Sequence, residues 1–332
     1  MSNLLTKLRK NTVVDAQILK SSKYFDNKKH ISTRIPLLNL ALSGKLNGGL
    51  PAGIIQIAAP PKHFKTNFMI ELMHAFQEEN KGKDYLIVLY DSELGSTIEY
   101  YEKMGIDTSK VDHRPIKSVE ELRSDCANLL NDIESGDLVL ICVDSIGMLR
   151  SNKETEDAKK EHDAADFSRA KALKSFFRII TGESAIKQIP IVIVNHSYQT
   201  MELYAKEVAA GGRGAQYAAH TLLFISKAQE KDDKDLVGFR FTVRAALSRY
   251  VKENSTFPIT VFFGEGIDKY SGIFDYAVAL GYIEQASQGW YWTDKEKTKK
   301  IRQSVMEEDH ELLQKFLDDP EFCEKVESQY RL

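Results

Sequence analysis

Four short apolar runs, separated by longer amphipathic segments, organise the middle of the chain. The runs are residues 54–59, 85–90, 138–143 and 189–195. Nearly continuous apolar runs of this length are typical of strands that are covered on both faces, as in parallel sheets. We therefore expect these runs to form parallel strands at the centre of the fold.

The segments between the runs have the spacing of amphipathic helices. Residues 118–134 place their apolar side chains on one helical stripe, and Ser118 is suited to be the N-cap. Residues 66–79 show a similar stripe. This alternation of strands and helices predicts an α/β fold with a doubly wound sheet.

The pattern changes after the fourth run. Residues 221–226, 239–246 and 259–263 follow each other with few helical residues between them, which indicates antiparallel strands added to the sheet. Residues 232–238 are the expected hairpin connection.

A small helical unit is expected beyond residue 268. Gly281 is suited to end its first helix, and two short helices are expected at about 308–317 and 320–330.

Composition and charge narrow the class of protein. The chain has 332 residues, of which 42% are hydrophobic and 28% charged, as in ordinary globular proteins. It has neither a window of about 18 uncharged apolar residues nor an apolar N-terminal stretch, so we expect no membrane partner and no secretory signal. Three widely spaced cysteines suit a reducing cytoplasm. The net charge of −3 means that any DNA-binding surface is local.

A candidate phosphate-binding loop follows the first apolar run and opens a helix. Residues 58–68 keep the spacing of the pattern G-x-x-x-x-G-K-[ST], but Ala59 and Phe64 replace its two glycines. Lys65 would supply charge for the β- and γ-phosphates, and Thr66 a hydroxyl for Mg²⁺. The ordinary alternative is a solvated helix N-terminus. The other loop residues that we expect to contact nucleotide are Pro60, Pro61, Lys62, His63 and Asn67.

Two acidic residues follow the second and third runs. Asp144 ends residues 138–144, at the edge of a parallel sheet where a Walker B carboxylate holds Mg²⁺. Glu93 is placed to orient and deprotonate a water that attacks the γ-phosphate. Each residue alone is as well explained by a turn or a helix start. Their occurrence together with the phosphate loop favours a nucleotide site.

On these motifs and others the chain resembles the RecA family, and more closely the UvsX recombinases of T-even-like bacteriophages. A phenylalanine directly before Lys-Thr, as at Phe64, is also similar to the sequences of the phage group. The resemblance runs from about Ile31 to Asp268. The matching stretches include IPLLNLALSGKLNGGLPAG (35–53), KHFKTNF (62–68), LYDSELG (89–95), VDSIGML (143–149), IVIVNHSYQT (191–200), GGRG (211–214) and FGEGIDKYSG (263–272).

The resemblance implies a RecA-type P-loop ATPase core with a mixed, mainly parallel sheet flanked by helices. It implies ATP and Mg²⁺ as cofactors, helical filaments on single-stranded DNA, and pairing with a homologous duplex. Single-strand-binding and loader proteins would be further partners. The expected divisions are an N-terminal polymerisation arm at 1–33, the core at 34–268 and a small C-terminal region at 269–332.

The resemblance also implies roles for three further residues of the nucleotide site. Tyr100 would stack on adenine, although a half-buried helix tyrosine is the alternative. His196 would sense the γ-phosphate, although a hydrogen-bonded core histidine is the alternative. Arg249 would reach the nucleotide of a neighbouring subunit, whereas Leu247 occupies the second position where a cation is expected. Arg244 and Lys252 are candidate substitutes for it.

Two polar segments occupy the positions of the family's DNA-binding loops. Residues 150–166 would be the first loop, and residues 197–215 the second. The alternatives are a charged solvated face and a mobile surface loop with incidental aromatic residues. The expected DNA-binding residues are Arg169, Lys171, Lys174, Arg178, Tyr198, Gly211, Gly212, Arg213 and Gly214.

Two other functions stay open at this point. One is a hexameric helicase or another motor with the same fold. The other is a filament mediator that binds DNA without hydrolysing ATP, which the unusual Ala59, Phe64 and Leu247 leave open.

Overall fold

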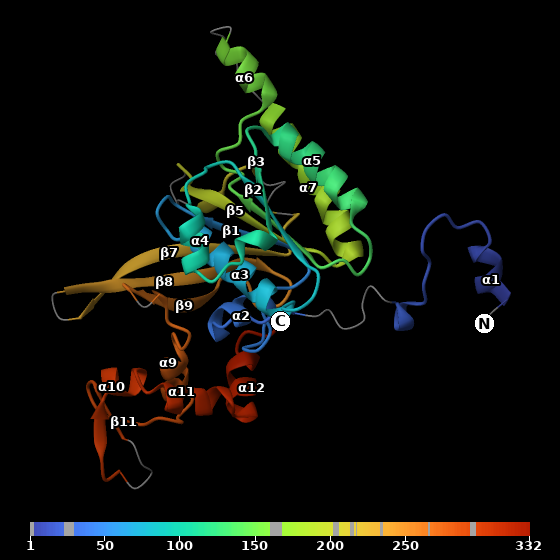
Figure 1. Ribbon diagram of the computed structural model, residues 1–332. Helices are drawn as coiled ribbons and strands as arrows, with labels where there is room; N and C mark the ends of the chain where they lie inside the picture. The colour runs from blue at the N-terminus through green and yellow to red at the C-terminus, as the bar shows by residue number, and fades with distance from the viewer. Residues whose placement is uncertain are drawn as a thin grey trace.

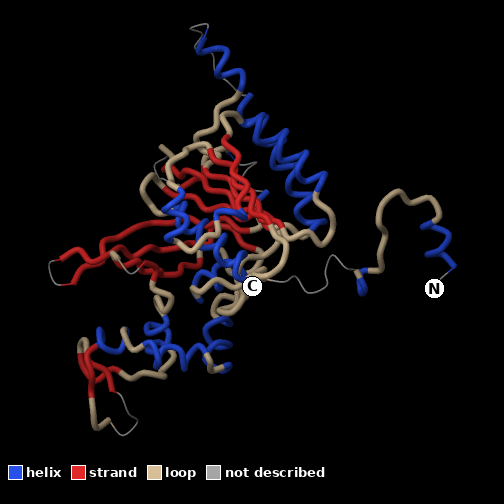
Figure 2. Tube along the Cα trace, viewed as in Figure 1, coloured by secondary structure: helices blue, strands red, loops and turns tan. Residues whose placement is uncertain are grey.

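A ten-stranded mixed sheet forms the centre of the computed structural model, which describes residues 3–22, 30–159, 168–201, 206–212, 216, 218–232, 235–264, 266–292 and 297–332. The strand order is β10-β9-β8-β7-β1-β5-β4-β2-β3, with β6 paired to β5. Figure 2 shows the strands as one continuous sheet, from which the β7–β8 ribbon extends. The strands are β1 (Gly53–Ala59), β2 (Leu86–Asp91), β3 (Val111–Pro115), β4 (Val139–Asp144), β5 (Pro190–Gln199), β6 (Glu207–Ala209), β7 (Thr221–Asp232), β8 (Asp235–Ser248), β9 (Ser255–Phe262) and β10 (Gly266–Ile267).

The predicted strands are confirmed. All four apolar runs are parallel strands, β1, β2, β4 and β5, at the centre of the sheet. The three later segments are the antiparallel strands β7, β8 and β9. The predicted connection at 232–238 is wrong in extent, because β8 already begins at Asp235. Gly238 pairs within the ribbon, where a Cβ would lie 2.2 Å from the carbonyl oxygen of Val261.

Helices cover both faces of the sheet, as Figure 1 shows. Neighbouring residues of the central strands therefore belong to opposite cores: Ile55 packs with Phe68 of α3, and Ile54 packs with Phe176 of α7. The predicted N-cap is also confirmed, because Ser118 forms a capping box with Glu121. The helices of this part are α2 (Pro36–Ser43), α3 (Lys65–Glu79), α4 (Ile98–Lys103), α5 (Val119–Asp132), α6 (Asn152–Lys159) and α7 (Ser168–Lys187).

Helix α6 occupies the start of the segment expected to be a polar loop. Its N-terminus is capped, because Ser151 Oγ accepts from the Glu154 amide at 2.9 Å and the Glu154 carboxylate accepts from the Ser151 amide at 3.2 Å. Reciprocal bonds of this kind satisfy two donors that a helix start otherwise leaves unpaired. The rest of the expected loop, residues 160–166, lies outside the described residues.

The C-terminal unit contains more than the expected helices. A three-stranded antiparallel sheet precedes the two predicted short helices, which are confirmed. Helix α9 ends just before Gly281, whose φ of 76° is the left-handed conformation that glycine favours. The elements are α9 (Ile273–Ala279), β11 (Gln285–Ser287), β12 (Trp290–Trp292), β13 (Lys300–Arg302), α10 (Gln303–Glu307), α11 (His310–Leu317) and α12 (Pro320–Ser328).

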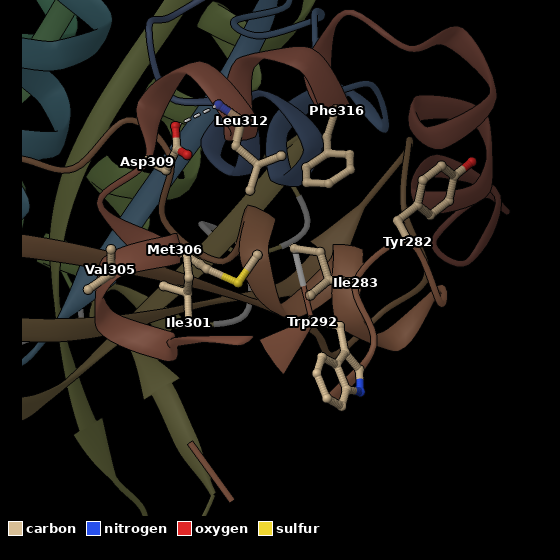
Figure 3. A pocket seen from close by; sticks show the side chains of 9 residues that line it. All are labelled: Tyr282, Ile283, Trp292, Ile301, Val305, Met306, Asp309, Leu312 and Phe316. Carbon is tan, nitrogen blue, oxygen red and sulfur yellow. Dashed lines mark hydrogen bonds between the residues drawn. The ribbon is translucent and has the colours of Figure 1, made fainter. Parts of the chain in front are cut away.

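This unit is anchored on the main core and has a small cavity of its own. Phe322 of α12 is fully buried, and Glu327 accepts a hydrogen bond from the Leu46 amide at 2.9 Å. The cavity, of about 220 Å³, lies between the small sheet and α11 (Figure 3). It is lined by Tyr282, Ile283, Trp292, Ile301, Val305, Met306, Asp309, Leu312 and Phe316.

The N-terminal segment lies apart from the rest of the structure in Figure 1. It contains α1 (Asn3–Arg9) and the 3₁₀ turn η1 (Leu19–Ser21), and its Leu4 and Leu8 side chains are exposed. Tyr24 and Phe25, two further apolar residues of this segment, lie outside the described residues. Among the helices that the structure describes, none has the length and apolar character needed to span a bilayer.

Candidate functional site

The carboxyl ends of β1, β2, β4 and β5 meet at one edge of the sheet. In the strand register Ala59 is opposite His196, and Asp91 is opposite Asp144. The expected phosphate loop begins directly after β1. The topology therefore brings together residues that the sequence places at the ends of four separate strands.

The phosphate loop adopts left-handed backbone at two residues that are not glycine. Lys62 has φ of 61° and Phe64 has φ of 58°. Residues other than glycine are strained in the left-handed region, because their Cβ approaches the backbone too closely. The position of the second missing glycine thus keeps the conformation that glycine favours. His63 Nδ1 lies 2.8 Å from the Pro61 carbonyl oxygen.

Lys65 and Thr66 open α3 beside Asp144. Lys65 is buried and donates from Nζ to the Pro60 carbonyl at 3.1 Å, and its burial lowers its pKa. Thr66 Oγ1 donates to Asp144 Oδ2 at 2.6 Å. Burial raises the pKa of Asp144 to about 6. The Thr66 hydroxyl and the buried Asp144 carboxylate are thus in contact. Both are hard oxygen donors, which suit Mg²⁺.

Glu93 lies at the same edge, with its carboxylate held by two neighbours. Ser145 Oγ donates to Glu93 Oε1 at 2.6 Å, and His196 Nε2 lies 3.3 Å from the same oxygen. The nearby imidazole of His196, and then the hydrogen bond from Ser145, hold the pKa of Glu93 at about 2. The Glu93 side chain is still 40% exposed, so it remains accessible to solvent.

Two positioning residues were missed by the sequence analysis. Asp91 Oδ1 accepts from the amides of Glu93 at 3.0 Å and Leu94 at 2.8 Å, which fixes the turn that carries Glu93. Ser145 holds the carboxylate and bonds through its backbone with Ser92. The signal in the sequence was the Asp-Ser pair that ends two neighbouring strands.

His196 connects this edge to the hairpin of β5 and β6. The Ala210 amide donates to the His196 carbonyl at 2.8 Å, and Asn195 Nδ2 donates to the Ala210 carbonyl at 2.8 Å. The residues directly after β6 are therefore hydrogen-bonded to the backbone of the residue whose imidazole meets Glu93.

Asn67 and Tyr100, two other expected nucleotide contacts, lie together. Asn67 Nδ2 donates to the hydroxyl of Tyr100, which is half-buried on α4. This arrangement is compatible both with a ring at the wall of a base pocket and with an ordinary helix tyrosine.

The residues expected to act on a neighbouring subunit have different surroundings. Arg249 is exposed, one residue beyond β8. Arg244 forms an ion pair with Glu207 of β6 at 3.0 Å, and Lys252 Nζ donates to a backbone carbonyl near the C-terminus at 2.9 Å. Both candidate substitutes for the cation missing at Leu247 are therefore engaged within their own chain.

The expected cations of the first DNA loop separate into two groups. Arg169 donates to the carbonyls of Leu149 at 2.6 Å, Ile146 at 3.0 Å and Gly147 at 3.1 Å, so its guanidinium holds the turn after β4. The other three are exposed on α7: Lys171, Lys174 and Arg178.

The second expected DNA loop is partly a β-hairpin. β5 continues to Gln199 and pairs with β6 in antiparallel register, so residues 197–199 and 207–209 of this segment are strands. Tyr198 is 54% exposed on this hairpin. Gly211 and Gly212 follow it with positive φ, while Arg213 and Gly214 lie outside the described residues.

Comparison with known proteins finds a matching family model and similar sequences. The family model for the RecA N-terminal domain matches residues 7–268. The chain is 42% identical over 307 residues to the "Recombination and repair protein" of Enterobacteria phage T4, covering 91% of this chain and 78% of that protein. It is 26% identical over 262 residues to "Protein RecA" of Chloroherpeton thalassium, covering 78% and 71%. "Protein RecA" of Acholeplasma laidlawii is 23% identical over 318 residues, covering 93% and 90%.

Proposed function

The chain belongs to the RecA family, and from this premise we propose that it is a DNA-dependent ATPase of homologous recombination. It forms helical filaments on single-stranded DNA and pairs that strand with a homologous duplex. The observation that carries the proposal is the contact of Thr66 with Asp144, beside the buried Lys65 and within the same edge as Glu93. The phage relative supports action in the cytoplasm of a bacterial host.

The chemistry follows from these four side chains. Lys65 offers a cation to the β- and γ-phosphates of ATP, at a buried position where charge is weakly screened. Thr66 and Asp144 are the residues that hold Mg²⁺, which when bound supplies further positive charge for the phosphates. Positioning and charge stabilisation of this kind account for most of the catalysis of phosphoryl transfer.

Glu93 orients the attacking water in this proposal. A carboxylate with a pKa of about 2 is always ionised at neutral pH but is a weak proton acceptor. It becomes more basic when His196 leaves it, because the nearby imidazole is the largest cause of the low pKa. If His196 moves from Glu93 to the γ-phosphate of bound ATP, Glu93 therefore becomes a better proton acceptor. The same movement signals that the nucleotide is bound.

The same exchange offers a physical route to DNA dependence. His196 is bonded through its carbonyl to the segment after β6, and Glu207 of that hairpin pairs with Arg244 of β8. DNA bound near Tyr198 and the glycines would bias the hairpin and so the position of the imidazole. Exposed Lys171, Lys174 and Arg178 give local positive charge on a chain whose net charge is −3.

ATP turnover with and without single-stranded DNA tests the proposal, with Lys65→Ala and Glu93→Gln as controls. We expect strong stimulation by DNA that both variants lose. Substantial turnover by Lys65→Ala would overturn the assignment of the phosphate site. Binding of ATP and DNA by the wild type without turnover would favour a filament mediator. Electron microscopy of the DNA complex separates a helical filament from a closed ring, which would favour a helicase.

A further inference from the structure

The ring of Phe64 packs on the β7–β8 ribbon. Its centroid lies 5.1 Å from that of Phe241 and 6.3 Å from that of Phe239. Phe241 is fully buried and also meets Phe68 of α3 at 5.9 Å, edge to face. The side chain at the position of the missing glycine thus joins an aromatic cluster rooted in the core.

The other left-handed residue of the loop is held from the same ribbon. Lys227 Nζ donates to the Lys62 carbonyl at 2.9 Å. The same ammonium lies 4.5 Å from the centroid of the Phe239 ring, within the range of a cation–π interaction. One lysine therefore links the loop backbone to the ring cluster.

The strand register explains why these side chains converge. Phe239 and Phe241 are two residues apart on β8, so they face the same side of the sheet. Lys227 is the direct partner of Phe241 on β7. All three therefore lie on one face, and both left-handed residues of the phosphate loop contact them.

We propose that Lys227, Phe239 and Phe241 are positioning residues that fix the phosphate loop in its nucleotide-binding conformation, in place of the freedom that a glycine would give. This inference rests on the proposed ATP site and adds residues that lie far from the loop in the sequence. We call the three residues the loop clamp. It stabilises a conformation that Lys62 and Phe64 would otherwise leave.

Two substitutions at position 64 distinguish positioning of the phosphate loop from a merely structural role. At position 64, alanine keeps the steric cost of left-handed backbone but loses the ring contacts. Glycine loses the ring contacts but has no such cost. Phe64→Ala should therefore weaken binding of Mg²⁺-ATP about tenfold, whereas Phe64→Gly should weaken it only about threefold.

The clamp itself is tested with Lys227→Met and Phe239→Ala. Both should raise KM for ATP about three- to tenfold and leave kcat at saturating ATP nearly unchanged, because they act on loop geometry and not on the reacting atoms. Lys231→Met is the matched control, since Lys231 is exposed farther along β7. It should keep the KM of the wild type.

Nucleotide titration and steady-state ATP turnover give the readouts, with circular dichroism to verify folding of each variant. Equal affinities for Phe64→Ala and Phe64→Gly would overturn the inference, as would equal KM values for Lys227→Met and Lys231→Met. If Phe239→Ala does not fold, two comparisons still test the proposal: Phe64→Ala with Phe64→Gly, and Lys227→Met with Lys231→Met. A Lys65→Ala variant with wild-type turnover would instead overturn the proposed function, so the two failures are distinguishable.

Discussion

Gly147 leaves the space that the imidazole of His196 occupies: a Cβ added at position 147 would lie 2.3 Å from His196 Cδ2 and 3.0 Å from Cγ. No side chain, however small, fits there without moving the ring. The imidazole reaches Glu93 from this position, so the absence of a side chain at 147 is a condition for the contact of 3.3 Å.

Gly147→Ala should therefore act on His196 without removing it. We expect DNA-stimulated ATP turnover to fall about tenfold, because a displaced imidazole can no longer pass from Glu93 to the γ-phosphate in response to DNA. Gly182→Ala is the control, since Gly182 lies within α7 and an added Cβ there meets no atom within 4 Å. Wild-type stimulation in Gly147→Ala would contradict a role for the placement of the ring.

Thr66→Val should raise the Mg²⁺ concentration needed for half-maximal turnover. Valine has a similar shape but cannot donate to Asp144, so one oxygen donor and the bond of 2.6 Å are lost. We expect a rise of about tenfold or more, and near-normal behaviour for Thr66→Ser, which keeps the hydroxyl. A Mg²⁺ titration of ATP turnover measures both, and equal curves for Thr66→Val and the wild type would refute the assignment.

Arg34→Met should destabilise the protein, and the loss should depend on pH. The Glu71 carboxylate is 0% exposed and is bound by Arg34 Nε at 3.1 Å and Nη2 at 2.8 Å. Burial raises the pKa of Glu71, and Arg34 counteracts that rise, so the variant pKa lies higher still. Above this pKa a buried charge lacks its guanidinium partner, and we expect a loss of about 2 kcal/mol.

The sign of the pH effect follows from protonation. As the pH falls through the raised pKa, Glu71 becomes neutral and the difference between variant and wild type should shrink. Urea unfolding at pH 8 and pH 5.5 measures this. The Arg34→Met, Glu71→Gln double variant should show a smaller loss with little pH dependence. A loss for Arg34→Met that is the same at both pH values would be inconsistent with this account.

Ser118→Ala should cost about 1 kcal/mol of stability, because it removes the side-chain acceptor of the capping box at the start of α5. Ser124→Ala is the matched change on the exposed face of the same helix, where alanine is the better helix former. Thermal unfolding should therefore order the variants with Ser118→Ala below the wild type and Ser124→Ala at or above it. The reverse order would show that the cap contributes nothing.

The central strands could be predicted because both of their faces are buried, which leaves runs such as residues 189–195 almost without polar residues. Strand β3 was not predicted because it lies at the edge of the sheet, and its sequence Val-Asp-His-Arg-Pro has no such run. Helix α6 was missed although Ser151 and Glu154 have the spacing of a capping box. Its polar composition is typical of a loop, and the sequence analysis therefore predicts one.

Within the candidate site, the predictable residues are those that follow a strand. Lys65, Glu93 and Asp144 meet because parallel strands end at a common edge, which is a property of topology. The contact of Phe64 with Phe241 and the pairing of Arg244 with Glu207 depend on which side chains face each other between distant segments. No local pattern reports that, so the sequence shows only that Phe64 replaces a glycine and that Arg244 is a candidate cation for the neighbouring subunit.

The strand order also constrains when the protein can fold. β1 lies between β5 and β7, so its first edge has no partner until residues 190–196 have been made, and its second edge has none until the chain has passed residue 221. Contacts between segments so distant in sequence are slow to form, because closing the intervening chain costs entropy before the contacts reward it. During synthesis β1 is at first an apolar segment with two unpaired edges. Such a segment is prone to aggregation. The strand that precedes the phosphate loop is thus made among the earliest and enclosed among the latest.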